Sequence, residues 1–188
     1  GRIPLVGGIA IAFGLCSSLL ILNISLSSFR ALLAGILLLV FIGIMDDFKE
    51  VSARTRIIVQ IFVALLVTCW GGIQVNQLGH LLDTTTNFIL GAWAIPFSTL
   101  AIVALINAYN MLDGLNGLLG GISFINCCCL LWIASCVHAY ESVQWLCILA
   151  SSLLGFLCFN FPLGRHQKRL VFLGDAGSTS LGLITAWF

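Results

Sequence analysis

Residues 84–112 read TTTNFILGAWAIPFSTLAIVALINAYNML, and no charged side chain lies between Asp83 and Asp113. A helix of about 20 apolar residues crosses the roughly 30 Å hydrocarbon core of a bilayer. Because the backbone amides of a bilayer-spanning segment must be satisfied internally, this run predicts a transmembrane helix over 94–112. The stretch therefore decides the fold class in favour of a helical membrane protein.

The rest of the chain repeats the pattern. Further uncharged runs cover 3–29, 31–45, 57–82, 114–140, 142–164 and 176–188. They predict about seven spans, near 5–26, 29–45, 56–72, 94–112, 117–137, 142–161 and a partial one from 178. We expect one all-α, polytopic transmembrane bundle that includes the whole of residues 1–188.

Composition supports this class and excludes others. Of the 188 residues, 60% are hydrophobic and 8% are charged, whereas soluble domains carry about 25% charged residues. So few charges could not cover the surface of a soluble globule. A nucleic-acid-binding protein needs a basic excess, and the net charge here is only +1. We therefore expect membrane lipid and no nucleic acid among the partners.

The few charges are distributed unevenly between the two sides of the predicted bundle. Alternating spans leave only Arg30 on one side and place the other basic residues together, namely Arg2, Lys49, Arg54, Arg56, Arg165, Lys168 and Arg169. The positive-inside rule then makes the loops 46–55 and 162–176 cytoplasmic. The same map brings most acids to that side, namely Asp46, Asp47, Glu50, Asp113 and Asp175.

Three polar segments thus meet at the cytoplasmic face. Asp46 and Asp47 end a span, and adjacent carboxylates need a cation or a protein partner, or else form a solvated helix end beside Lys49. Asn107, Asn110 and Asp113 share one helix face, as residues do that line a cavity or bond neighbouring helices.

The third segment is Gly174-Asp175-Ala176-Gly177-Ser178. We expect Ser178 to begin the last helix as its cap, with backbone N–H groups facing an anion; capping alone is the alternative. Carboxylate and amide oxygens suit Mg²⁺ or Mn²⁺, and Lys49 and Arg56 are among the basic residues that could bind phosphate. Together the segments predict metal-assisted phosphoryl transfer at the membrane surface, with a lipid phosphate as one substrate.

Four motifs occur in this order along the chain: Arg2–Gly8, Asp46-Asp47, Asn107–Gly114 and Gly174–Ser178. On these residues the chain resembles the polyprenyl-phosphate N-acetylhexosamine-1-phosphate transferases of glycosyltransferase family 4, most closely the bacterial undecaprenyl-phosphate N-acetylglucosamine-1-phosphate transferases. The resemblance implies transfer of N-acetylglucosamine-1-phosphate, or another N-acetylhexosamine-1-phosphate, from a UDP-sugar to undecaprenyl phosphate, with release of UMP. It implies the first membrane step of cell-envelope polysaccharide synthesis, in the bacterial inner membrane.

The resemblance also implies residue roles. Asp46 and Asp47 match the pair that activates the lipid phosphate or assists the metal, and Asp175 matches the aspartate most directly tied to Mg²⁺. Asp113 and Asn110 match the polar cluster at the nucleotide-sugar site, where Asp113 is a catalytic candidate. The candidate metal ligands are Asp175, Asp47 and Asn110. The remaining substrate-binding candidates are Asn107, Asn116, Arg56, Asn160, Lys49 and Ser178.

At one position the sequence departs from the pattern. Bacterial relatives commonly read Asp-Gly-x-Asp-Gly, and this chain reads Asp113-Gly114-Leu115-Asn116-Gly117. An amide cannot act as a carboxylate base, but it can donate and accept hydrogen bonds, so Asn116 keeps a binding role.

The resemblance further leads us to expect a piece of a larger protein of about ten to eleven spans. An N-terminal span and the C-terminal spans with a His-rich loop would then be absent, and a homodimer is possible. A membrane transporter is one alternative, although transporters place ionisable residues near the bilayer midplane, and here they sit at span ends. A non-catalytic scaffold is the other, and it predicts that the aspartates tolerate replacement by Asn.

Overall fold

The computed structural model describes residues 7–21, 26–49, 51–79, 87–161 and 171–188, apart from the side chains of Leu20, Asp47 and Phe48. The Arg2–Gly8 motif lies largely outside these residues, and so does the basic stretch 165–169. The described part contains seven α-helices and no strand, which confirms the all-α prediction. They are α1 (Gly7–Ile21), α2 (Arg30–Phe48), α3 (Ala53–Cys69), α4 (Ala94–Leu112), α5 (Leu118–Cys136), α6 (Tyr140–Asn160) and α7 (Gly174–Trp187).

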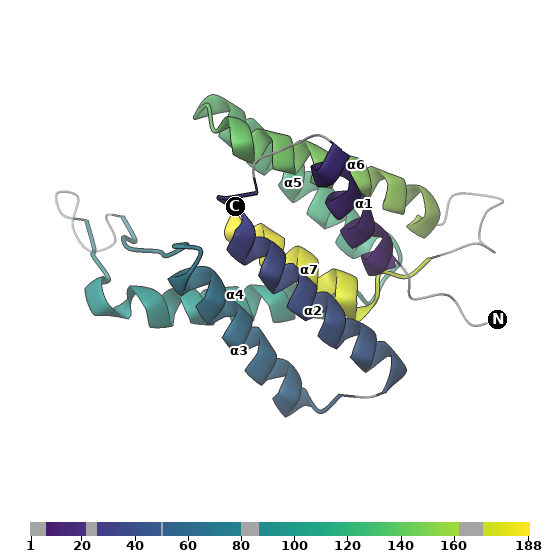
Figure 1. The fold of residues 1–188 in the computed structure, drawn as a ribbon, viewed down its shortest axis with the longest axis horizontal. Helices are drawn as coiled ribbons and strands as arrows, with labels where there is room; N and C mark the ends of the chain where they lie inside the picture. Colours follow the sequence, from purple (N-terminus) through teal and green to yellow (C-terminus); the bar gives the residue numbers. More distant parts are fainter. Residues whose placement is uncertain (1–6, 22–25, 50, 80–86, 162–170) are drawn as a thin grey trace.

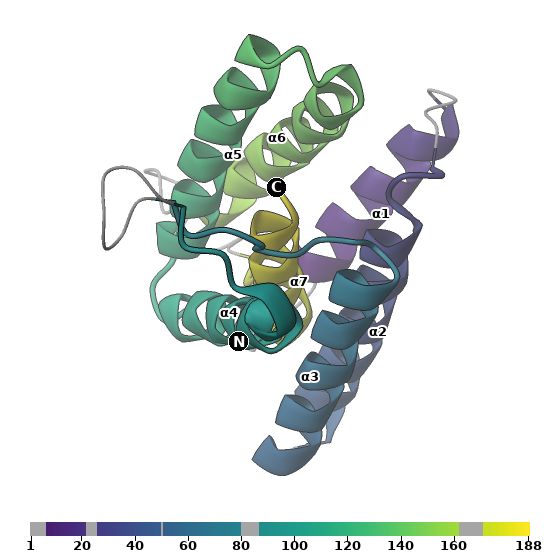
Figure 2. The ribbon, with the colours of Figure 1, turned by 90° about the vertical axis from the view of Figure 1, so that its left-hand side faces the viewer.

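Helix α7 is the centre of the bundle. It packs against α1, α2, α4 and α5, while α2 also packs on α3, α3 on α4, and α5 on α6. Figures 1 and 2 show α7 enclosed between these helices. All of its residues from Ala176 to Ile184 are buried, although several are small or hydroxylated. The hydroxyls of Thr179 and Ser180 donate to carbonyls four residues earlier, so these polar groups are satisfied inside the bundle.

Close contact between α2 and α7 depends on one small residue. A Cβ atom built on Gly43 would overlap the backbone of Ala176, so only glycine lets the two helices approach this closely. Gly43 lies one helical turn before Asp46, and Ala176 directly follows Asp175. The packing of α2 on α7 therefore sets how far apart the two aspartates lie.

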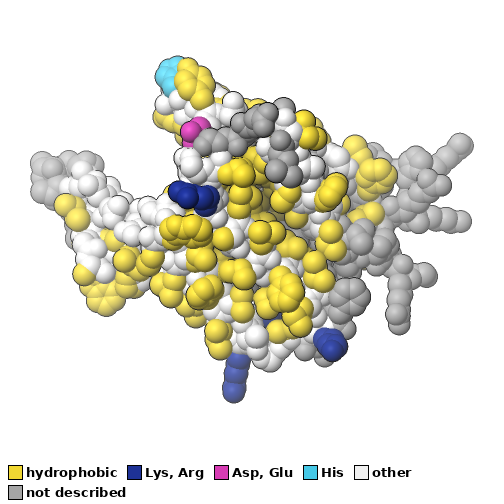
Figure 3. Space-filling view, viewed as in Figure 1, with side chains coloured by type: hydrophobic (Ala, Val, Ile, Leu, Met, Phe, Trp, Pro, Cys, Tyr) yellow, Lys and Arg dark blue, Asp and Glu magenta, His cyan; other side chains and the backbone are white. Residues whose placement is uncertain are grey.

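The outer surface is apolar, as a bilayer requires. Large side chains such as Phe13, Phe62, Leu100 and Trp132 are at least half exposed. Figure 3 shows hydrophobic side chains scattered across the described part of one face, with few charged side chains among them. Within the part of the chain that the structure describes, three segments are long and apolar enough to cross a membrane by themselves, Gly91–Leu112, Leu118–Cys136 and Tyr140–Asn160. These features support a membrane protein.

The last helix begins earlier than the sequence predicts. The sequence predicts Ser178 as its cap, but the helix begins at Gly174, so this prediction is wrong. Gly174 takes a positive φ of 73°, which turns the chain into the helix four residues sooner. Ser178 is therefore fully buried inside the helix, and Asp175 lies in the first turn. A carboxylate in that turn is stabilised by the partial positive charge of the helix N-terminus.

Candidate active site

Four helix ends meet at one end of the bundle and place polar side chains around one cavity. Asp46 lies at the end of α2, Arg56 at the start of α3, Asn110 at the end of α4 and Asp175 at the start of α7. The cavity between them has a volume of about 110 Å³. Its polar lining residues are Asp46, Arg56, Gln60, Asn107, Asn110, Asp175 and Thr179. Segments far apart in the sequence thus form one site.

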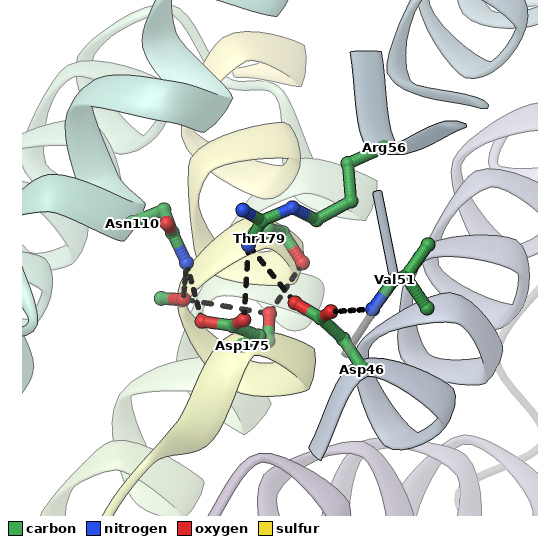
Figure 4. Close-up of polar contacts among 7 residues, drawn as sticks. Asp46, Val51, Arg56, Asn110, Asp175 and Thr179 are labelled. Atoms are coloured by element: carbon green, nitrogen blue, oxygen red, sulfur yellow. Dashed lines mark hydrogen bonds and ion pairs between the residues drawn. The ribbon is translucent and has the colours of Figure 1, made fainter. Parts of the chain in front are cut away.

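The Arg56 guanidinium bridges the two aspartates (Figure 4). Its Nη1 lies 2.9 Å from Oδ2 of Asp46 and 3.4 Å from Oδ2 of Asp175. The side chain of Asp46 is only 9% exposed, whereas those of Asp175 and Arg56 are 35% and 39% exposed. The bridge therefore lies at the mouth of the site, where water and a solute can reach it.

The other oxygen of each carboxylate also accepts a hydrogen bond. The backbone N–H of Val51 donates to Oδ1 of Asp46 at 2.6 Å. The amide of Asn110 donates to Oδ1 of Asp175 at 2.8 Å and to Oγ of Ser178 at 3.0 Å. All four carboxylate oxygens are therefore partnered, and both carboxylates are held in defined orientations.

The two carboxyl groups differ in how easily they ionise. Burial raises the pKa of Asp175 above its ordinary value, and the hydrogen bond shared with Asp46 raises it further, against the opposing effects of Asn110 and Arg56. For Asp46, burial acts in the same direction but is outweighed by the bonds from Asp175, Val51 and Arg56, so the pKa of Asp46 is lowered. Asp46 is therefore the carboxylate that stays ionised most readily.

The donor set fits a hard divalent cation. Among the described residues no group of three or more Asp, Glu, His or Cys side chains comes together. Mg²⁺, however, is usually bound through one or two carboxylates plus substrate phosphates. Asp46 and Asp175 supply two carboxylates within reach of one guanidinium, and Asn110 turns its amide nitrogen to Asp175 and Ser178. The two carboxylates thus fit such an ion when substrate phosphates complete its ligands.

Two site residues were not singled out from the sequence as functional. Gln60 is buried one helical turn after Arg56, and its Oε1 accepts a bond of 2.6 Å from the amide of Asn107. Thr179 lines the cavity and donates to the carbonyl of Asp175 at 2.6 Å. A polar residue inside an apolar span is a signal of function or of a buried partner, and that signal could have found Gln60.

Several predicted site residues lie elsewhere. Asn160 is buried, accepts a bond from Gly117 N–H at 2.6 Å and donates to the Val171 carbonyl at 2.7 Å. Gly117 has a positive φ of 78°, so Asn160 secures the turn between α4 and α5. The cavity lining does not include Asp113, which ends α4, nor exposed Asn116 and Lys49, among the described residues. The side chain of Asp47 is outside the described residues.

The polar cavity adjoins an apolar groove. Ile57 lines both, and the groove runs between α3 and α4 with a volume of about 510 Å³. The groove is lined by Ile57, Ile61, Leu65, Ile95, Pro96, Thr99, Leu100 and Val103. A charged site thus lies beside an apolar groove on the surface of the bundle.

Comparison with known proteins gives a consistent result. The model of glycosyl transferase family 4 matches residues 29–188. The chain is 37% identical over 193 residues to an undecaprenyl-phosphate alpha-N-acetylglucosaminyl 1-phosphate transferase of Yersinia pestis, covering 100% of this chain and 51% of the relative. The protein of that name in Escherichia coli K12 is 33% identical over 188 residues, covering 100% and 50%.

A more distant relative comes from Bacillus subtilis. This probable undecaprenyl-phosphate N-acetylglucosaminyl 1-phosphate transferase is 31% identical over 180 residues, covering 95% of this chain and 48% of the relative. The chain therefore spans about half the length of the curated relatives it matches. Nothing in these comparisons favours a transporter or a scaffold.

Proposed function

The chain belongs to glycosyl transferase family 4, and on that premise we propose that the whole protein transfers N-acetylglucosamine-1-phosphate from a UDP-sugar to undecaprenyl phosphate. The proposal adopts the acceptor and the sugar in the names of the relatives. One observation carries it at the level of the structure. Asp46, Arg56, Asn110 and Asp175, from four helix ends, converge on a single cavity that lies beside an apolar groove.

In the proposed reaction, the lipid phosphate replaces UMP on the β-phosphorus of the UDP-sugar. An oxygen of the lipid phosphate forms a bond to the β-phosphorus of the UDP-sugar. The bond from that phosphorus to the oxygen bridging to the α-phosphate breaks, and UMP leaves with the electron pair. The products are a lipid-diphosphate sugar and UMP, so atoms and charge balance without any redox step.

The chain's own residues contribute positioning and charge. Asp46 and Asp175 would hold Mg²⁺, which when bound would neutralise phosphate charge. Asn110 orients the carboxylate of Asp175 through a bond of 2.8 Å. Arg56 offers a guanidinium able to bind a phosphate through two N–H groups. Asp46, with its lowered pKa, stays ionised near neutral pH and is therefore suited to ligation rather than to proton donation.

The groove between α3 and α4 is suited to the acceptor's hydrocarbon chain. A polyprenyl chain is apolar throughout, and of the groove's lining residues only Thr99 carries a polar side chain. Because Ile57 lines both groove and cavity, a lipid in the groove would place its phosphate at the site. The positive-inside rule puts this end of the bundle on the cytoplasmic side, and we propose the bacterial inner membrane as the location.

The test is product formation by the full-length protein in detergent. UDP-N-acetylglucosamine labelled in the sugar is supplied with undecaprenyl phosphate and Mg²⁺, and label is counted in the organic extract. The proposal expects Mg²⁺-dependent lipid labelling, which disappears in D46N and D175N. Activity in those variants equal to the wild type would favour a non-catalytic role for the aspartates.

A further inference from the structure

The position of Arg56 between Asp46 and Asp175 has a consequence for cation binding. Its Nη1 lies 2.9 Å from Oδ2 of Asp46 and 3.4 Å from Oδ2 of Asp175. The Oδ1 atoms of both carboxylates are directed at other donors, Val51 N–H and the Asn110 amide. The two Oδ2 atoms are therefore the pair through which a single ion could bind both aspartates.

Arg56 and a divalent cation cannot share that pair. Mg²⁺ requires oxygen ligands at about 2.0–2.1 Å, whereas Nη1 already occupies the space between the same two oxygens. Two positive groups so close together would also repel each other strongly in a partly buried site. Binding of the cation to both carboxylates must therefore displace the guanidinium.

The Arg56 side chain has room to move away from the two carboxylates. Arg56 lies at the first turn of α3 with 39% of its side chain exposed, and it lines the same cavity as both aspartates. A released guanidinium there would present five N–H donors suited to phosphate oxygens. We infer that Arg56 is an exchangeable counter-ion, which holds the two carboxylates together without a cation and becomes a phosphate ligand once a divalent cation replaces it.

This inference deepens the proposed function and rests on its divalent cation. It predicts that removing the positive charge of Arg56 increases the affinity of the site for the cation. Arg54 lies two residues before Arg56 on α3 and is exposed. Among the described contacts it has none with a carboxylate, so it provides a matched control.

The first experiment measures Mg²⁺ binding to the full-length protein by calorimetry, without substrates. R56Q should bind Mg²⁺ about tenfold more tightly than the wild type. A nearby arginine lowers the pKa of an aspartate by about one to three units, and the expected change in Mg²⁺ affinity corresponds to the lower end of that range. R54Q should bind as the wild type does. Equal or weaker binding by R56Q would overturn the inference.

The second experiment uses the wild type and does not depend on the folding of a variant. Phenylglyoxal modifies accessible guanidinium groups, and mass spectrometry reports the rate at each arginine. Mg²⁺ should speed labelling of Arg56 several-fold and leave Arg54 unchanged. An unchanged or slower rate at Arg56 would overturn the inference.

A transfer assay run in parallel separates the two proposals. Transfer without Mg²⁺-induced release of Arg56 would overturn the exchange and leave the proposed function standing. Release of Arg56 without transfer from any UDP-sugar would contradict the proposed function and leave the exchange standing.

Discussion

The amide nitrogen of Asn110 lies 2.8 Å from Oδ1 of Asp175, across 65 positions of sequence. The same nitrogen also donates to Ser178, at 3.0 Å. This contact links the end of α4 to the start of α7 and fixes the orientation of the Asp175 carboxylate. If Asp175 holds Mg²⁺ as proposed, Asn110 is a positioning residue, which affects function without touching the substrate.

Replacing Asn110 by alanine should therefore lower transfer by about 10- to 100-fold, the usual cost of removing a group that orients a metal ligand. The apparent affinity for Mg²⁺ should fall along with it, because the carboxylate loses its fixed orientation. Initial rates at varied Mg²⁺ concentration measure both effects. An N110A enzyme with wild-type rate and Mg²⁺ dependence would show that the contact has no functional role.

The opposite pKa shifts of the two aspartates predict opposite effects on stability. The raised pKa of Asp175 means that its stabilising contribution is present below the unfolded-state pKa and is lost as pH rises through the folded-state value. The lowered pKa of Asp46 means that its contribution is present above the unfolded-state pKa and is lost as pH falls through the folded-state value.

In cation-free buffer at neutral pH, D175N should therefore melt at a higher temperature than the wild type, and D46N at a lower one. The advantage of D175N should vanish as the pH falls below the ordinary aspartate pKa of about 3.9. Thermal melts of the detergent-solubilised protein in EDTA check both directions. If D175N melted lower than the wild type at neutral pH, the account of the Asp175 environment would be wrong.

Gly43 offers a test of spacing that leaves every site residue in place. G43A puts a methyl group into the backbone of Ala176, so α2 and α7 must separate and take Asp46 away from Asp175. A shift of about 1 Å can cost roughly 100-fold in rate, and we expect a loss of that size in the transfer assay. G155A on α6 is the control, because nothing lies within 4 Å of the added atom, and it should retain activity.

A buried hydroxyl holds three helices together behind the site. Tyr109 Oη accepts bonds from Asn126 of α5 at 2.7 Å and from Thr185 of α7 at 3.0 Å. Y109F leaves both donors without their acceptor and should cost about 1 kcal/mol of stability. Denaturant titration measures the loss, and Y140F is the control because Tyr140 is 72% exposed. Equal losses in the two variants would contradict this reading.

The sequence predicted α4, α5 and α6 well because each lies almost wholly within a long uncharged run. The predicted span 94–112 coincides with α4, and the predicted 117–137 and 142–161 each lie within two residues of α5 and α6. The start of α7 was missed because the turn depends on the backbone of Gly174, and a capping pattern at Ser178 gave a plausible but wrong alternative.

The sequence predicts which residues form the site better than it predicts how those residues contact one another. Charge sorting brought Asp46, Arg56 and Asp175 to one face, and the family resemblance singled out Arg56 among the basic residues there. The ion pair that joins them depends on how closely α2, α3 and α7 pack, and no local pattern encodes that distance. Asn160, which the resemblance assigns to substrate binding, also bonds Gly117 and Val171, and no local pattern predicts those contacts.

The exchange of UMP tests the central claim most directly. Purified full-length protein receives radiolabelled UMP, unlabelled UDP-N-acetylglucosamine, undecaprenyl phosphate and Mg²⁺, and label is followed into the UDP-sugar. Because label can enter only if the lipid-diphosphate sugar forms and reverts, the account predicts labelling by the wild type that requires the lipid and Mg²⁺ and is lost in D175N. No labelling with any UDP-sugar tried would contradict it.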